Sequence, residues 1–144
     1  MEEAGVEKLA RTDRRLAVIS AVFDHDPMLM GTPNGTLDLR DGSLQRPNQG
    51  DLITRMAGCS PAADDEGEPE LWLRFLNDVT RGDAAFIRYL QTICGYCLTG
   101  RTTEHSLFFA HGPGGNGKSV FINILRAVMG DYAIVAPMET FVAS

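Results

Sequence analysis

One stretch of the chain, residues 110–123 (AHGPGGNGKSVFIN), restricts what the chain can fold into more than any other. Four glycines and a lysine occupy the seven positions from Gly112 to Lys118, directly between two apolar segments. Because glycine weakens regular structure, such a loop indicates a backbone that must approach a ligand closely. The loop fits the pattern G-x-x-x-x-G-K-S/T, with an expected buried strand at 106–111 and an expected helix at 118–129.

This strand–loop–helix arrangement predicts a site for the phosphates of a nucleoside triphosphate. Backbone N–H groups of a glycine loop surround a phosphate chain, and the N-terminus of the following helix favours an anion. We expect Lys118 to reach the β- and γ-phosphates and the Ser119 hydroxyl to ligate Mg²⁺. The expected binding residues are Gly112, Pro113, Gly114, Gly115, Asn116, Gly117, Lys118, Ser119 and Val120. The alternative is a glycine-rich turn at a strand end.

Hydrolysis of the triphosphate makes a further demand on the chain. It requires an acidic residue at the end of a second buried strand, where it holds Mg²⁺ and positions water. The acidic residues after the loop are Asp131, which follows an expected helix end, and Glu139, which follows Pro137 in a segment unsuited to a central strand. We therefore expect the chain to stop before the catalytic half of a nucleotide-binding domain.

The residues in front of the loop predict a small α+β region. Turn-forming pairs at 34–35 and 41–42 indicate a meander of short antiparallel strands within 29–47, and residues 51–59 could add another strand. A polar, acidic connector follows at 60–70. Helical patterns cover residues 2–20 and 84–98, and a third helix places four side chains on one face: Trp72, Phe75, Leu76 and Val79. Asp83 is the expected N-cap of the second helix, with Gly100 and Gly130 as helix stops.

The composition narrows the functional classes. The chain is 44% hydrophobic and 22% charged with a formal net charge of −6, so bulk charge does not attract nucleic acid. The basic cluster of Arg11, Arg14 and Arg15 is expected to be a solvated helix face. No apolar run is long enough to span a membrane, and the acidic N-terminus lacks a signal-peptide core. These features predict a cytoplasmic protein with no membrane partner.

The three cysteines are expected to be packing residues. Cys94 and Cys97 form a C-x-x-C pattern near the end of a helical segment, whereas a redox pair lies at a helix N-terminus that lowers the thiol pKa. Together with Cys59 they make an odd count, which argues against a disulfide framework. The histidines do not complete a zinc spacing with them.

Three longer segments resemble a known family. They are NGTLDLRDGSL, LWLRFLNDVTRGDAAFIRYLQTICGYCLTG and HSLFFAHGPGGNGKSVFINILRAVMGDYA. They are similar to the C-terminal region of phage and plasmid primase–helicases, which carry a superfamily 3 helicase module akin to poxvirus nucleoside triphosphatases. The resemblance runs from about Asp24 to the end of the chain, and its most specific parts are GGNGKS and GDYA.

The resemblance implies an ATP-dependent DNA helicase that acts in the replication of a phage, prophage or plasmid inside a bacterial cell. It implies an α+β accessory domain at 1–102, followed at 103–144 by the first strand–loop–helix unit of an α/β P-loop ATPase core. Such helicases work as homo-hexamers on single-stranded or forked DNA, with ATP at the subunit interfaces. At the loop, the resemblance assigns ATP phosphates to Lys118, the candidate catalytic residue, and Mg²⁺ to Ser119.

Two alternatives to an active helicase stay open. The second acidic motif, the polar sensor, the arginine that completes a neighbour's site and a primase active site have no positions in these 144 residues. The chain alone is therefore expected to lack turnover, and it could be a non-catalytic remnant or a module that binds DNA or a protein partner. A P-loop kinase is a weaker alternative, because its loop would lie near residue 10.

Overall fold

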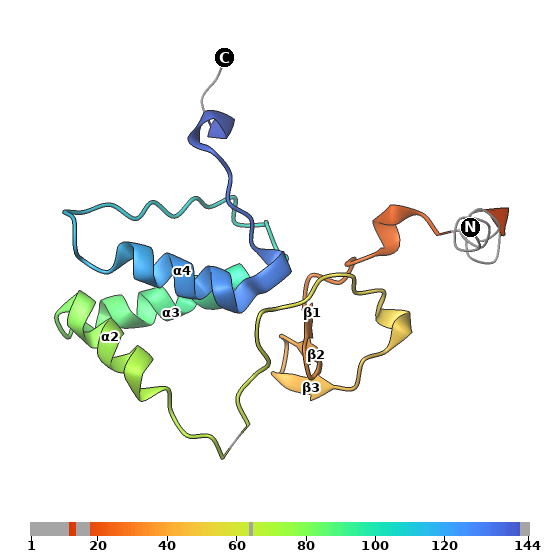
Figure 1. Ribbon diagram of the computed structural model, residues 1–144, viewed down its shortest axis with the longest axis horizontal. Coiled ribbons are helices and arrows are strands. Elements are labelled where there is room, and N and C mark those ends of the chain that lie inside the picture. The colour runs from red at the N-terminus through yellow and green to blue at the C-terminus, as the bar shows by residue number, and fades with distance from the viewer. Residues whose placement is uncertain (1–11, 14–17, 64, 142–144) are drawn as a thin grey trace, which may run out of the picture.

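The structure is a computed structural model that describes residues 12–13, 18–63 and 65–141. A three-stranded antiparallel sheet lies beside the helices α2, α3 and α4 (Figure 1). The predicted α+β class is confirmed for this part of the chain. The predicted helix at 2–20 and its arginine cluster fall mostly outside the described residues, and Ser20–Val22 form a short 3-10 turn. Within the described residues, no helix has the length and apolar character needed to cross a membrane.

The sheet confirms the predicted meander. Its strands are β1 (Leu29–Thr32), β2 (Gly35–Asp38) and β3 (Ser43–Gln45), in the order β1-β2-β3. The first turn lies at residues 33–34, one position earlier than predicted, because Gly35 already pairs with Thr32. The second turn ends at Gly42, which has φ 76° and donates its N–H to the Asp38 carbonyl at 2.8 Å. Positive φ is a conformation that glycine adopts without strain.

Residues 51–59 do not form the additional strand that the sequence suggested. After a 3-10 turn at Gln49–Asp51, the segment is irregular and covers β1 at Gly31. A β-carbon at Gly31 would approach Ile53 Cγ2 to 2.9 Å and would also meet the Arg55 carbonyl. Further along, the Ala57 N–H donates to the Gly31 carbonyl at 2.8 Å. Because Gly31 has no side chain, the segment packs directly on the backbone of β1 instead of extending the sheet.

Local signals explain some of the ends of the three helices. They are α2 (Glu70–Thr80), α3 (Ala84–Leu98) and α4 (Lys118–Met129). The Asp83 carboxylate caps α3 by accepting a hydrogen bond from the Phe86 N–H at 2.9 Å. Gly130, with φ 54°, ends α4. The predicted cap of α3 and the predicted stop of α4 are both confirmed, whereas the C-cap of α3 is Thr99, one residue before the predicted stop at Gly100.

One prediction about the region around the loop is wrong. Residues 106–111 are not a buried strand: they run as an irregular segment along α4 (Figure 1), with Leu107 84% and Phe109 80% exposed. A strand requires a neighbour to accept its hydrogen bonds, and no other described segment pairs with this one. Helix α4 beside it is partly exposed as well, with Val120 and Ile122 about half exposed.

The C-terminal end of α4 is held against the sheet region by a set of long-range hydrogen bonds. The Gly58 N–H donates to the Val128 carbonyl, and the Asp131 N–H donates to the Met56 carbonyl, both at 2.9 Å. The Tyr132 hydroxyl accepts the Gly31 N–H at 2.8 Å and donates to the Arg55 carbonyl at 3.1 Å. Figure 1 shows the result: the C-terminal ends of α3 and α4 lie toward the sheet, and the N-terminal end of α4 lies away from it.

Buried apolar side chains are few. Among the described residues they are Met30 on β1, Ala57 in the covering segment and Leu76 on α2. One lies in the sheet, one where the sheet region meets α4, and one within the helices. The described part of the chain is therefore held together by small contacts of this kind and by the hydrogen bonds at the end of α4.

Candidate phosphate-binding site

The glycine loop leads directly into α4. Gly117 is the N-cap of the helix and has φ 83°, and Gly112 and Gly115 also have positive φ, at 149° and 74°. A β-carbon at Gly112 would come within 2.6 Å of Asn116 Nδ2. The glycines at 112 and 117 are thus required by the shape of the loop, and not only by its flexibility.

The Lys118 side chain folds back over the loop. Its Nζ donates to the carbonyls of Gly112 and Pro113, at 2.9 and 3.0 Å, and to Asn116 Oδ1 at 2.6 Å. Three oxygen acceptors therefore surround one ammonium group inside the turn. An anion that enters the loop would meet a positive charge already held at its mouth.

The first turn of α4 presents unused donors beside this lysine. The first hydrogen bond of the helix runs from the Phe121 N–H to the Gly117 carbonyl at 2.9 Å, and no side chain caps the helix N-terminus. The N–H groups of Lys118, Ser119 and Val120 precede that bond. Such groups, with the positive end of the helix dipole, are suited to an anion. The side chain of Ser119 is exposed at the same turn.

The predicted site residues are thus contiguous in space as well as in sequence. Gly112 to Val120 form one loop and helix turn, in which Gly112, Pro113 and Asn116 enclose the lysine ammonium. The geometry suits a chain of phosphate groups. The roles of ATP and Mg²⁺ stay predictions.

The acidic residues after the loop lie elsewhere. The Asp131 carboxylate accepts a hydrogen bond from the Met56 N–H at 3.2 Å, beyond the C-terminal end of α4. Since α4 has 12 residues, about 18 Å separates this end from Ser119. Glu139 lies on a 3-10 turn at Met138–Phe141. In the part of the chain that the structure describes, no group of three or more histidines, cysteines or acidic residues could hold a metal ion.

The neighbourhood of the loop is otherwise apolar. A hollow of about 300 Å³ between the helices is lined by Trp72, Leu76, Leu90, Gln91, Cys94, Gly95, Leu98 and Phe121. Burial raises the pKa of the Cys94 thiol, and the nearby Cys97 adds to this rise. Burial also raises the pKa of Cys97. Both thiols therefore favour the neutral form, which fits packing residues better than reactive ones.

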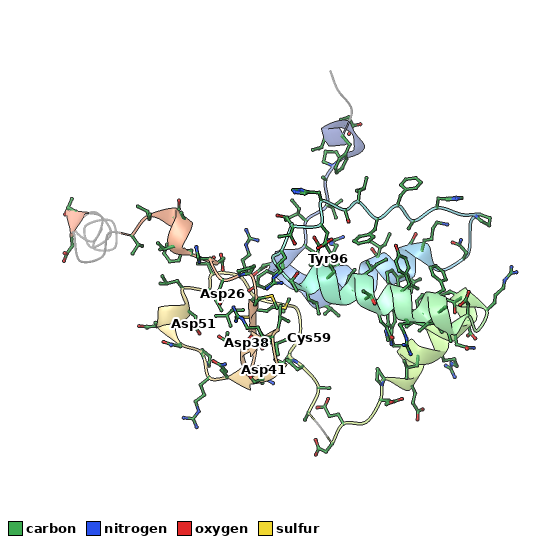
Figure 2. All side chains as sticks on the ribbon, turned by 180° about the vertical axis from the view of Figure 1, so that it is seen from behind. Asp26, Asp38, Asp41, Asp51, Cys59 and Tyr96 are labelled. Carbon is green, nitrogen blue, oxygen red and sulfur yellow. The ribbon has the colours of Figure 1, made fainter. Side chains whose placement is uncertain are left out.

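Acidic side chains gather at the sheet instead. Figure 2 shows Asp26, Asp38, Asp41 and Asp51 around the sheet, whereas Tyr96 lies among the helices. The Asp26 carboxylate pairs with the Arg40 guanidinium at 2.7 Å, and this hydrogen bond lowers the pKa of Asp26. These carboxylates do not favour binding of a phosphate group at the sheet.

A second acidic site near the sheet is equally unsuited to an anion. The Asp24 carboxylate accepts hydrogen bonds from the N–H and the hydroxyl of Thr54. Burial acts to raise the pKa of Asp24, but these hydrogen bonds and the charge of Arg55 outweigh it, so the pKa is lowered. The open hollow of about 700 Å³ that contains these residues is thus lined by an ionised carboxylate.

One part of the site was not predicted. Trp72 on α2 stacks on Phe121 of α4 with ring centroids 5.7 Å apart, and on Phe75 at 5.3 Å. The sequence placed the two α2 residues on one helical face, which is the only signal that it offers. It did not indicate that this face packs against the first turn after the glycine loop.

Comparisons with known proteins agree with the resemblance to primase–helicases. A protein of Acanthamoeba polyphaga mimivirus, named "Putative helicase", is 29% identical over 120 residues; the match covers 81% of this chain and 12% of that protein. The chain thus spans a small part of the length of this relative. Residues 4–81, more than half of the chain, match the family model described as D5 N terminal like. The chain therefore belongs to the D5 N terminal like family.

Proposed function

We propose that this chain is part of an ATP-dependent DNA helicase of the primase–helicase type and that it binds the phosphates of ATP. The observation that carries the proposal is the Lys118 ammonium, held by three loop oxygens beside the unused N–H groups of α4. The D5 N terminal like family and the mimivirus relative named as a helicase support the class of protein.

In this proposal each loop residue has a defined task. Lys118 exchanges its bonds to the loop carbonyls for bonds to the β- and γ-phosphates, where an ammonium offsets negative charge. The N–H groups of the loop and of residues 118–120 bind the phosphate oxygens, and the Ser119 hydroxyl is a ligand for Mg²⁺. Gly114 and Gly115, where a β-carbon would meet nothing within 4 Å, leave the backbone open to the ligand, and Gly112 and Gly117 give the loop its shape. The backbone at Pro113, Asn116 and Val120 completes the enclosure.

The proposal separates binding from turnover. Asp131 is occupied in holding Met56, and the described residues offer no acidic cluster at the loop. ATP hydrolysis then requires residues beyond those described, such as those of a longer chain or of neighbours in a homo-hexamer. The proposed division is an accessory domain at 1–102 and a P-loop segment at 103–144, with single-stranded or forked DNA as the partner and the host cytoplasm as the location.

The hydrogen bond that Asp131 accepts from the Met56 N–H also favours a second candidate function. If no other acidic residue reaches the loop, the chain binds DNA, a protein partner or ATP without hydrolysing the nucleotide. Sustained ATP turnover by the chain, stimulated by single-stranded DNA, would exclude this candidate.

Calorimetric titration of Mg-ATP tests the first proposal. The parent chain should bind, and Lys118→Ala should bind about 100-fold more weakly or not at all, because it loses several charge-assisted hydrogen bonds. Arg126→Ala is the matched control, since it removes one positive charge from the other end of the same helix. Equal affinity of the parent and Lys118→Ala, or no binding to the parent, would overturn the proposal.

A further inference from the structure

The last glycine of the loop lies directly against helix α2. A β-carbon at Gly117 would be 2.5 Å from Val79 Cγ1 and 3.2 Å from Phe75 Cε2. Both partners are apolar side chains, and both are half-buried. The side of Gly117 on which a β-carbon would lie therefore faces α2 and not solvent.

The same face of α2 also holds the first turn of α4. Trp72, Phe75 and Val79 follow one another at spacings of three and four residues, which places them on one side of the helix. Trp72 stacks on Phe121, whose N–H donates to the Gly117 carbonyl at 2.9 Å. The contacts from α2 thus meet α4 at Gly117 and Phe121, on either side of residues 118–120.

We infer that Phe75 and Val79 are positioning residues that hold the phosphate-binding loop in its binding shape through Gly117. The inference rests on the proposed function, which it deepens. It assigns this task to residues inside the region 4–81 that matches the family model, although the loop itself lies outside that region. The region that matches the family model then supports the phosphate site and is more than a neighbouring module.

The physical reason is pre-organisation. Glycine has more backbone freedom than any other residue, so an unsupported Gly117 would sample several conformations and turn the N–H groups after it away from the ligand. Contact with Val79 and Phe75 removes these conformations before the ligand arrives. Fixing one backbone residue in advance corresponds to about 5- to 30-fold in affinity.

The test uses Val79→Ala in the full chain. It removes the methyl group nearest to Gly117, and the affinity for Mg-ATP should fall about 5- to 30-fold while the protein stays folded. Val79→Thr keeps the branched shape and should keep most of the affinity. Leu71→Ala is the control on the same helix, because Leu71 is 72% exposed. A purely structural role would lower the unfolding midpoint of Val79→Ala but leave the affinity of the folded protein unchanged.

A second measurement does not depend on nucleotide binding. Amide NMR relaxation of the ligand-free chain should show greater mobility at Gly117 and Ser119 in Val79→Ala, but not in Leu71→Ala. Unchanged loop mobility in Val79→Ala would overturn the inference, whatever the result with ATP. If the parent fails to bind Mg-ATP but Val79→Ala loosens the loop, the proposed function fails and the support of the loop by α2 stands.

Discussion

Replacing Tyr132 by phenylalanine should loosen the end of α4 from the sheet without removing a ring. In the parent the Tyr132 hydroxyl accepts the Gly31 N–H at 2.8 Å and donates to the Arg55 carbonyl at 3.1 Å. Gly31 and Tyr132 are 101 positions apart in the sequence. One hydroxyl group therefore connects the first strand to the segment after the phosphate-binding helix, and Tyr132→Phe removes both bonds at once.

The magnitude depends mainly on the Gly31 N–H. This donor is partly buried, and the site above it is occupied by Ile53 and the Arg55 backbone. A donor left without an acceptor costs about 1–3 kcal/mol, whereas the Arg55 carbonyl lies at an exposed position where water can replace the lost bond. Because Gly31 is not fully enclosed, we expect a loss of about 1–2 kcal/mol in the free energy of unfolding.

Urea unfolding followed by far-UV circular dichroism measures this loss. Tyr89→Phe is the control, because the Tyr89 side chain is 54% exposed and its hydroxyl can reach water. The control should lie within about 0.5 kcal/mol of the parent, as surface substitutions do. A change below about 0.5 kcal/mol for Tyr132→Phe as well would refute the reasoning, since the hydroxyl would then not connect the two regions.

The pH dependence gives an independent check on the same hydroxyl. Burial raises the pKa of Tyr132 above its ordinary value. The folded state thus favours the neutral hydroxyl, and the stabilisation is complete below the unfolded pKa of about 10 and is lost as pH rises through the raised folded value. Tyr132→Phe has no such group, so the stability difference should shrink above about pH 10. A difference that stays constant there would contradict this account.

Two further predictions concern the helices and the sheet. Trp72→Ala should lower the free energy of unfolding by about 2–3 kcal/mol, less than for a fully buried tryptophan, because Trp72 is half-buried between Phe75 and Phe121. Urea unfolding measures this loss. A loss below about 1 kcal/mol would mean that the stack does not form. Arg40→Gln should raise the pKa of Asp26, which the hydrogen bond from Arg40 now lowers. In the parent the pair stabilises the fold above the ordinary aspartate pKa of about 3.9 and ceases to do so as pH falls through the lowered value. NMR titration of the Asp26 carboxyl group would show this rise, and an unchanged titration would exclude the pair.

The features that local sequence signals predicted correctly are those with local causes. Asp83 caps α3 with a hydrogen bond to a residue three positions away, and Gly130 ends α4 with its own backbone conformation. The hairpin turns follow from residues within the turns themselves. Likewise, the glycine loop folds around Lys118, because the acceptors of that lysine lie two to six residues away.

The features that the sequence signals did not predict depend on residues far away in the chain. The segment 106–111 has the composition of a buried strand, but a strand exists only where another backbone accepts its hydrogen bonds, and composition does not supply one. Similarly, Thr36 is buried although it is polar, because it pairs with Gly31 on the face that residues 53–55 cover. The bond between Tyr132 and Gly31 has no sequence signal at all.

The same distinction between local and distant causes applies to the proposed phosphate site. The motif locates the groups that would touch phosphate, because those groups are neighbours in the sequence. It does not locate what keeps them in place, since α4 is held at its N-terminal end by Phe75 and Val79 and at its C-terminal end by residues 56–58. A variant at Phe75 or Val79 would keep the motif intact and still change the shape of the loop. Two chains with the same motif can therefore differ in affinity for nucleotide, and the difference would be found in the contacts that reach α4 from the residues before the loop.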